Sequence, residues 1–273
     1  MTAETRARLR ILSLGAGVQS TTLALMAARG EIEAPDCAIF ADTGWEPRAV
    51  YEHLARLREA LTYPVHVVSA GNLRDDIERG ASRRTGRIAA VPWYLRNPDG
   101  SAGMGRRQCT AHYKLEPLAR KVRELLGATP RGRVQGFAEI MVGISTDEAA
   151  RMRPARVRYM RNVWPLIDAG MSRAACLRWL ERAGWSAPKS SCVGCPFHSD
   201  AQWREIRDGS PDEWAEACRL DALIRTGGQS RGIRGEQFMH RSMVPLAEVD
   251  LATWSERGQP DLFQNECEGM CGV

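Results

Sequence analysis

The 273-residue sequence contains no long hydrophobic run, and no stretch approaches the roughly 20 consecutive apolar residues that a membrane-spanning helix requires. Residues 1–10 are polar and lack the apolar segment of a secretory signal peptide. Internal repeats and an obvious interdomain linker are lacking as well. These absences argue against a membrane-spanning helical protein and a repeat array. We therefore expect a cytoplasmic protein with no membrane partner.

The composition is that of a folded globular protein. Hydrophobic residues make up 44% of the chain, enough to bury a core, so a disordered protein is excluded. The length allows one large domain, alone or with a smaller appendage. In a reducing compartment the eight cysteines are interpreted first as thiols or metal ligands, because disulfides are rare there.

Positive charge is concentrated in the middle of the chain. Residues 79–161 hold 18 lysine and arginine residues against 6 acidic ones, a net charge of +12, whereas the remainder holds 20 against 27, a net of −7. Such a field attracts the phosphates of a nucleotide or a nucleic acid, although an arginine-rich solvated surface is the alternative. A tRNA or DNA bound through this segment, and a second copy of the chain in a homodimer, are the candidate macromolecular partners.

The first 70 residues alternate between strand and helix patterns. Residues 10–14, 37–40 and 65–68 are short apolar runs, and residues 20–28 and 46–61 have helical spacing. This order predicts an open parallel sheet flanked by helices, that is, an α/β fold.

Beyond residue 70 the patterns are weaker. Residues 79–107 have no sustained period and predict a long loop. Further predicted elements are a helix over 114–126, a strand within 133–144, helices over 172–182 and 211–225, and loops over 187–198 and 226–235. We divide the chain into an α/β nucleotide-binding domain, residues 1–170, and a helical, loop-rich, cysteine-bearing portion, residues 171–273.

The first chemical signal is a glycine loop, Ser13-Leu-Gly-Ala-Gly-Val-Gln-Ser20, between the first strand and the first helix. Glycines let the backbone approach a phosphate, and the following helix directs free N–H groups and its positive dipole end at the anion. The third glycine of GxGxxG is missing and no lysine follows, so the loop is neither a dinucleotide fingerprint nor a Walker loop. An ordinary tight turn is the alternative. The predicted phosphate-binding residues are Ser13, Gly15, Ala16, Gly17, Gln19 and Ser20.

Two further segments place acidic residues near predicted strand ends. Asp42 and Thr43 follow the second strand, at the sheet edge where ligands bind, so Asp42 is a candidate for a ribose hydroxyl or Mg²⁺; a helix N-cap is the alternative. Residues 143–148 and Arg151 combine acids with arginine, which fits a magnesium–phosphate site or an ion-paired loop. These segments add Asp42, Thr43, Gly143 and Arg151 to the nucleotide site, and Asp42 and Asp147 to the catalytic candidates.

The cysteines divide into two groups. Cys192 and Cys195 form a CxxC pair in a loop, Cys109 lies in the basic segment, and Cys267 and Cys271 lie in the tail. Thiolates in such a set ligate zinc or an iron–sulfur cluster, and we favour a 4Fe-4S cluster over zinc or a redox pair. The remaining three, Cys37, Cys176 and Cys218, fall in apolar strand or helix patterns and are expected in the core.

Five segments in order resemble the phosphoadenosine phosphosulfate (PAPS) reductase-like branch of the PP-loop ATP pyrophosphatase superfamily, the adenine nucleotide alpha hydrolase-like proteins. The resemblance spans residues 11–196. Its motifs are Ser13–Ser20, similar to SGGxDS; Phe40-Ala-Asp-Thr-Gly44; Arg107-Gln-Cys-Thr with Lys114; Gly143-Ile-x-x-Asp-Glu-x-x-Arg151; and Ser191-Cys-Val-Gly-Cys-Pro196.

The resemblance implies a five-stranded parallel sheet of the HUP type with an adenine nucleotide at the strand ends. The loop departs from ATP-using members, because Gln19 stands where they carry Asp and Ala16 where they carry Gly. The tail departs from the reductases: it contains Glu266-Cys267 and Cys271 but lacks the histidine of their Glu-Cys-Gly-Leu-His motif.

Three functions follow as hypotheses. The favoured one is an ATP- and Mg²⁺-dependent enzyme that adenylates an acceptor such as a nucleobase and transfers sulfur with a cluster held by cysteines. The second is a reductase of a sulfonucleotide (PAPS or adenylyl sulfate), in which Cys267 or Cys271 attacks the sulfur and sulfite is released. The third is a nucleotide sensor without enzymatic activity.

Overall fold

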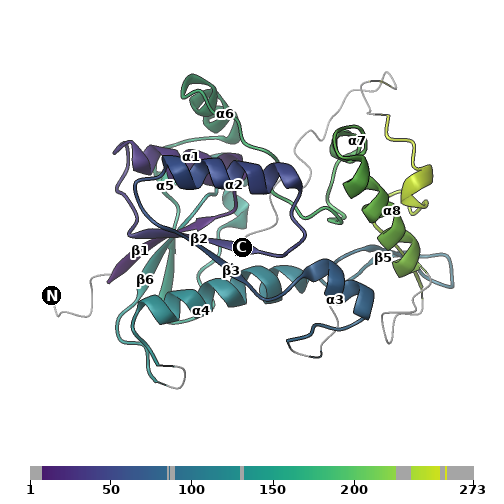
Figure 1. The fold of residues 1–273 in the computed structure, drawn as a ribbon, viewed down its shortest axis with the longest axis horizontal. Coiled ribbons are helices and arrows are strands. Elements are labelled where there is room, and N and C mark those ends of the chain that lie inside the picture. Colours follow the sequence, from purple (N-terminus) through teal and green to yellow (C-terminus); the bar gives the residue numbers. More distant parts are fainter. Residues whose placement is uncertain are drawn as a thin grey trace.

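The structure, a computed structural model, describes residues 8–84, 86, 90–129, 132–225, 235–252 and 256. Its centre is a five-stranded parallel sheet in the order β3-β2-β1-β6-β7 (Figure 1). The predicted α/β fold with an open parallel sheet is therefore confirmed. The strands are β1 (Leu9–Leu14), β2 (Cys37–Asp42), β3 (Val65–Ser69), β6 (Ala138–Val142) and β7 (Met160–Val163).

Helices cover both faces of this sheet, because successive side chains of a strand point alternately to its two faces. Leu12 and Leu14 of β1 pack in the cluster formed with α1 (Val18–Ala28), α2 (Arg48–Ala60), α5 (Pro165–Asp168) and α6 (Arg173–Arg182). Ile11, the residue before Leu12, belongs to the opposite cluster with α4 (Glu116–Leu125). Figure 1 shows α1, α2 and α6 on one side of the sheet and α4 on the other.

A second, smaller unit flanks the sheet. It contains an antiparallel sheet in the order β5-β4-β8, formed by β4 (Tyr94–Arg96), β5 (Ala102–Met104) and β8 (Glu236–Phe238). Helices α3 (Leu73–Arg79), α7 (Asp200–Gly209) and α8 (Pro211–Arg225) belong to the same region (Figure 1). Its core contains Trp45, Trp93, Tyr113 and Trp203. Because β8 pairs with β4, segments from both halves of the chain build this unit.

The prediction of a continuous loop over residues 79–107 was wrong. The segment contains β4 and β5, three residues each, which are too short to show a period-2 pattern. Sequence patterns also missed β7, α3, α7 and the π-helical turn Thr110–Leu115 before α4. The predicted strands and helices of residues 10–68 are confirmed within a few residues.

The three cysteines expected in the core are found there. Cys37 and Cys176 are buried, and Cys218 packs against the cluster around Trp203. Burial raises the pKa of each of these thiols to about 11, which keeps them protonated. Among the helices of the described segments, none is long and apolar enough to cross a bilayer.

Replacing Asp221 tests the anchoring of the smaller unit. Its fully buried carboxylate accepts hydrogen bonds from the N–H of Met239 (2.8 Å) and Leu246 (3.0 Å) and pairs with Arg225. Asp221→Ala leaves these donors without an acceptor, so we expect a loss of about 3 kcal/mol in the free energy of unfolding, measured by urea denaturation. The exposed Asp208→Ala is the control, expected to leave the midpoint unchanged. Equal stabilities of the two variants would contradict this role.

Acid should destabilise the fold through His53. Its ring lies 2.9 Å from the hydroxyl of Thr21, and burial, aided by Arg56, lowers the pKa of His53 from 6.5 to about 4. The folded state favours the neutral ring, so this stabilisation is complete above pH 6.5 and is lost as the pH falls towards 4. We expect His53→Gln to lose less stability than the wild type between pH 7 and pH 5, by about 1–2 kcal/mol. Equal losses in parallel denaturation series would argue against a buried neutral His53.

Candidate functional site

The candidate site lies where the order of the parallel sheet reverses. In the sheet, β1 lies between β2, which is the next strand in the chain, and β6, which comes much later in the chain. Open α/β sheets bind ligands at such a switch point, outside the carboxyl ends of the strands. The glycine loop follows β1 and Gly143 follows β6, so these two predicted segments flank this point.

The glycine loop has the backbone form of an anion-binding turn. Ala16 is fully buried with φ of +57°, a conformation that normally favours glycine. The Ser20 hydroxyl oxygen lies 3.2 Å from the amide nitrogens of both Gly15 and Gly17 and accepts their hydrogen bonds. The first-turn amides of α1 have no acceptor within their own helix, so the loop presents N–H groups at a positive helix end.

Two glycines of this region closely approach other segments, and at Gly143 the approach is to backbone. A Cβ atom on Gly143 would lie 2.8 Å from the backbone nitrogen of Ser20, which no side chain tolerates. A Cβ atom on Gly17 would lie 2.6 Å from the hydroxyl oxygen of Ser190. The structure therefore brings the ends of β1 and β6 together, and it adds Ser190, which sequence reasoning missed because its segment lies 170 residues later.

Asp42 and Thr43 occupy the turn after β2. Asp42 Oδ1 accepts hydrogen bonds from the N–H of Gly44 (2.7 Å) and the hydroxyl of Tyr51 (2.8 Å). The carboxylate thus shapes its own turn, and it is not the N-cap of α2, a position held by Pro47. The buried Thr43 donates to Glu46 Oε1 at 3.0 Å. The predicted pair is adjacent to both the glycine loop's strand and the cysteine pocket described below.

The acidic segment after β6 forms a closed hydrogen-bond network. Both oxygens of Asp147 accept from the N–H of Arg173 (3.0 and 3.2 Å), the first residue of α6. Glu148 pairs with Arg151 at 2.7 Å and accepts from Gln19 Nε2 at 3.1 Å. Gln19 of the glycine loop is therefore held by the segment after β6. The contacts within that segment are those of an ion-paired loop.

Burial and hydrogen bonding shift the pKa values of Asp147 and Glu148 in opposite directions. Burial acts to raise the pKa of Asp147, but hydrogen bonds from Ser145 and the Arg173 N–H outweigh it and lower the pKa. For Glu148 burial dominates over the attraction of Arg151, and the pKa is raised. Asp147 is thus firmly ionised and committed to the start of α6.

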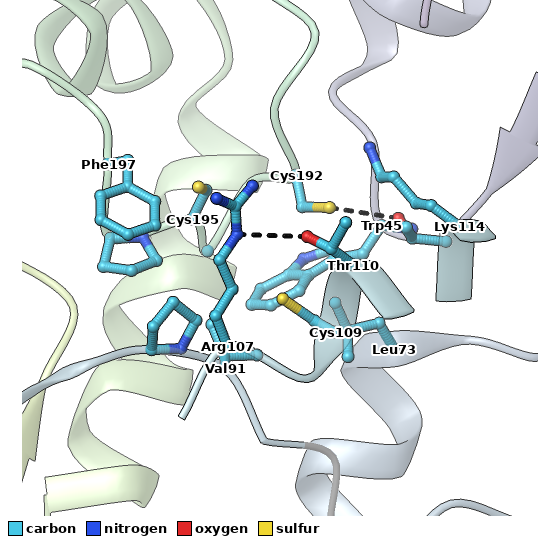
Figure 2. A pocket seen from close by; sticks show the side chains of 14 residues that line it. Trp45, Leu73, Val91, Arg107, Cys109, Thr110, Lys114, Cys192, Cys195 and Phe197 are labelled. Atoms are coloured by element: carbon cyan, nitrogen blue, oxygen red, sulfur yellow. Dashed lines mark hydrogen bonds between the residues drawn. The ribbon is translucent and has the colours of Figure 1, made fainter. Parts of the chain in front are cut away.

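The three predicted cysteines outside the tail line one pocket (Figure 2). Cys192 and Cys195 reach it from the CxxC loop and Cys109 from the segment before the π-helical turn. The pocket has an empty volume of about 430 Å³ including its open mouth. Arg107 and Lys114 supply positive charge, and Thr43 connects the pocket to the turn after β2. The sequence prediction that these cysteines come together is supported by this shared wall.

The CxxC loop is held between two tryptophans. A Cβ atom on Gly194 would lie 2.0 Å from the Trp45 ring, and Trp93 Nε1 donates to the carbonyl of Gly194 at 3.2 Å. Trp93 is buried, so it anchors the loop and is not available to stack on a base. His198 is also buried, with its Nε2 3.0 Å from the Cys192 carbonyl, and burial lowers its pKa to about 4. His198 is therefore a neutral ring that holds the CxxC loop through this hydrogen bond.

A polar chain extends from the pocket into the protein. Glu46 Oε1 accepts from Thr43, lies 3.1 Å from Lys114 Nζ and 3.5 Å from Cys192 Sγ. The Thr43 hydroxyl lies 3.3 Å from the same sulfur. Among the described residues, no partner reaches Glu46 Oε2 or Arg107 Nη2, although both atoms are buried. Sequence reasoning gave no role to Glu46, because a single acid near a helix start carries no distinctive signal.

The cysteines at the pocket are a suitable type of ligand for a metal cluster, but they are not spaced as a metal site requires. Thiolates are suitable ligands for iron or zinc. Within the described part of the chain, however, no three His, Cys, Asp or Glu side chains come together as a metal site. Cys267 and Cys271, predicted as further ligands and catalytic thiols, lie outside the described residues. The cluster and the role of the tail therefore stay predictions.

The charge of the basic segment is partly neutralised. Arg79, Arg84 and Arg96 pair with Asp76, Glu116 and Glu236. Lys114 and Arg151 are paired inside the candidate site. This pairing reduces the field that the composition suggested, and binding of tRNA or DNA stays a prediction.

Gly194→Ala tests whether the tryptophans position the thiols. The added methyl group overlaps the Trp45 ring, so either the loop or the ring must move. We expect a loss of about 2 kcal/mol in unfolding free energy and a change of several-fold in the alkylation rates of Cys192 and Cys195, followed by mass spectrometry. Gly209→Ala, where a Cβ atom meets nothing within 4 Å, is the matched control. Unchanged rates in Gly194→Ala would show that the loop is not held in this way.

No family model and no curated protein sequence matches the chain. Among solved structures, the fold is similar to the phosphoadenylyl-sulfate (PAPS) reductase from Candida auris, crystallised as a phosphate complex. The two share 12% sequence identity and a TM-score of 0.42, over 64% of this chain and 74% of that chain. A likeness this distant assigns neither substrate nor reaction, which must be argued from the site. In motif order and in its parallel α/β sheet, the chain resembles the PAPS reductase-like proteins.

Proposed function

We propose that the chain is an enzyme that binds an adenine nucleotide at the glycine loop and carries out sulfur chemistry with the thiols of the adjacent pocket. One observation carries this proposal: the segment from Ser190 to Cys195 contacts both regions. Ser190 lies against Gly17, and Cys192 lies 3.3 Å from the Thr43 hydroxyl beside the nucleotide site. A reacting group on a nucleotide bound at the loop would therefore lie near the thiols.

The loop would hold phosphate through the backbone rather than through a lysine. Its amides and the first turn of α1 supply donors, and the Ser20 hydroxyl can turn from Gly15 and Gly17 towards an anion. Asp42, with one oxygen engaged by Gly44 and Tyr51, offers the other to a ribose hydroxyl. These roles require no movement of the strands.

Two reactions of this class are candidates. In the first, an acceptor oxygen attacks the α-phosphorus of ATP and pyrophosphate leaves. A sulfide-level sulfur donor then attacks the activated carbon, the C–O bond breaks, and AMP is released. Arg107 and Lys114 carry positive charge at the pocket, and they favour an acceptor with negative charge. A tRNA or DNA bound through the basic segment 79–161 would be such an acceptor. In the second, a cysteine thiolate attacks the sulfur of a sulfonucleotide, the S–O bond to phosphate breaks, and a thiol reductant then releases sulfite.

The thiols also define where a metal would bind. Cys109, Cys192 and Cys195 would hold an iron–sulfur cluster or zinc together with a donor outside the described residues, and a cluster would supply sulfur or electrons there. The described donors do not by themselves meet the spacing of a metal site, so we assign no reaction step to it.

Nucleotide binding should depend on the approach of Ser190 to Gly17. Gly17→Ala places a methyl group against the Ser190 hydroxyl and narrows the loop, so we expect about tenfold weaker binding of AMP or ATP in calorimetric titrations. Gly209→Ala serves as the control and should bind like the wild type. Absence of heat with AMP, ADP, ATP and both sulfated adenylates would remove the proposed function. The products distinguish the two reactions. The ATP-dependent reaction yields AMP and pyrophosphate, whereas reduction of a sulfonucleotide yields sulfite.

Metal content tests the cluster prediction. Protein purified anaerobically should contain iron and sulfide, about four of each for a cubane cluster. The Cys109→Ser and Cys192→Ser variants should lose them, whereas Cys37→Ser, which alters a core thiol, should keep them. One zinc per chain would instead indicate a structural site, and protein free of both metals after reconstitution would contradict the prediction.

A further inference from the structure

The Asp147 and Glu148 carboxylates, predicted to bind Mg²⁺ beside the glycine loop, are already engaged by hydrogen bonds and an ion pair within the protein. Mg²⁺ at a nucleotide site is usually held by one or two carboxylate oxygens together with the phosphates, at about 2.0–2.1 Å. Both oxygens of Asp147 already accept from the N–H of Arg173, at 3.0 and 3.2 Å. A metal ion on this carboxylate would compete with the shared hydrogen bond that the first residue of α6 donates.

Glu148 is engaged on both oxygens as well. Oε1 pairs with Arg151 at 2.7 Å, and Oε2 accepts from Gln19 Nε2 at 3.1 Å. The Gln19 amide also donates to Ser145 at 3.3 Å, and its own oxygen accepts from Arg173 Nη1 at 3.2 Å. Gln19 therefore commits its whole amide group to Ser145, Glu148 and Arg173.

Two guanidinium groups largely cancel the negative charge that a dication would need. Arg151 pairs with Glu148, and Arg173 donates its backbone N–H to Asp147 and its guanidinium to Gln19. Gln19 is 8% exposed, so these interactions are poorly screened by water. Mg²⁺ placed between the loop and Glu148 would approach two guanidinium groups and gain no unengaged carboxylate there. The residues present do not fit the ion.

Asp42 is the remaining carboxylate of the site. Its Oδ1 accepts from Gly44 and Tyr51, and among the described residues no partner reaches Oδ2. One oxygen suits a ribose hydroxyl, the role given to it above. It is also a place beside the glycine loop where an added metal could still bind, so Asp42 needs its own control.

From these contacts we propose that the glycine loop binds its nucleotide as a metal-free anion, and that Gln19 sets this property by holding Glu148 in the acidic segment. The inference rests on the proposed function and narrows its substrate class. Nucleotides whose phosphates are neutralised by backbone amides and arginines fit the site. Those that require a chelated Mg²⁺ for binding do not.

The test compares ADP binding in EDTA and in millimolar Mg²⁺ by calorimetry, in the full-length protein and two variants of equal size. For the wild type we expect dissociation constants within about threefold of each other, because no protein carboxylate assists the ion. Gln19→Asp adds a carboxylate beside Glu148 and the phosphates, so binding in EDTA should weaken about tenfold and recover with Mg²⁺. Gln19→Asn, which matches Asp in size but carries no charge, should show no such recovery.

The outcomes separate this inference from the proposed function. Binding in both buffers, with Mg²⁺ dependence only in Gln19→Asp, supports it. ADP binding by the wild type only with Mg²⁺ overturns it while the proposed function stands, and loss of that dependence in Asp42→Asn would place the ion at Asp42. A Gln19→Asp variant insensitive to Mg²⁺ would overturn the role of Gln19. Absence of heat with AMP, ADP and ATP in either buffer would refute both.

Discussion

The site depends on the close approach of three backbone segments at the carboxyl end of β1. Gly143 after β6 meets the backbone of Ser20, and Ser190 meets Gly17. These contacts leave no room for side chains on Gly17 and Gly143, so backbone and the small side chain of Ser190 form the wall of the site. An anion there would be bound mainly by N–H groups, whose positions are fixed by the parallel sheet and by the start of α1. Ala16, held at positive φ, is the strained residue that this loop shape requires.

The same contacts place the thiols. The chain continues from Ser190 to the CxxC pair, and Trp45 and Trp93 fix Gly194 between them. Trp45 itself follows the turn of Asp42 and Thr43. The glycine loop, the turn of Asp42 and the cysteine pocket are thus neighbouring parts of one packed region. This continuity is the physical basis for joining nucleotide binding and sulfur chemistry in one proposal.

The sequence predicted the parts with strong local signals. The strands of residues 10–68 are apolar runs bounded by turns, and their parallel arrangement follows from the alternation with helices. The gathering of Cys109 with Cys192 and Cys195 followed from residue type and resemblance. Strands of three residues, such as β4 and β5, have no period to detect, and β8 is defined by its pairing with β4.

The partners of individual side chains could not be predicted, since they depend on tertiary contacts. The pattern around Asp147 and Glu148 fits a magnesium site and an ion-paired loop equally well. Only the positions of Arg173 and Gln19, which lie 26 residues after Asp147 and 128 before it, distinguish the two. Glu46 and Ser190 likewise become parts of the site through packing alone.

A crystal structure of the full-length protein grown with AMP tests the central claim most directly. The account predicts that the phosphate lies against the amides of residues 15–20, with the ribose towards Asp42 and the CxxC thiols on the neighbouring wall. Density for the nucleotide elsewhere on the sheet, or a glycine loop kept closed by Ser190 at saturating AMP, would contradict it.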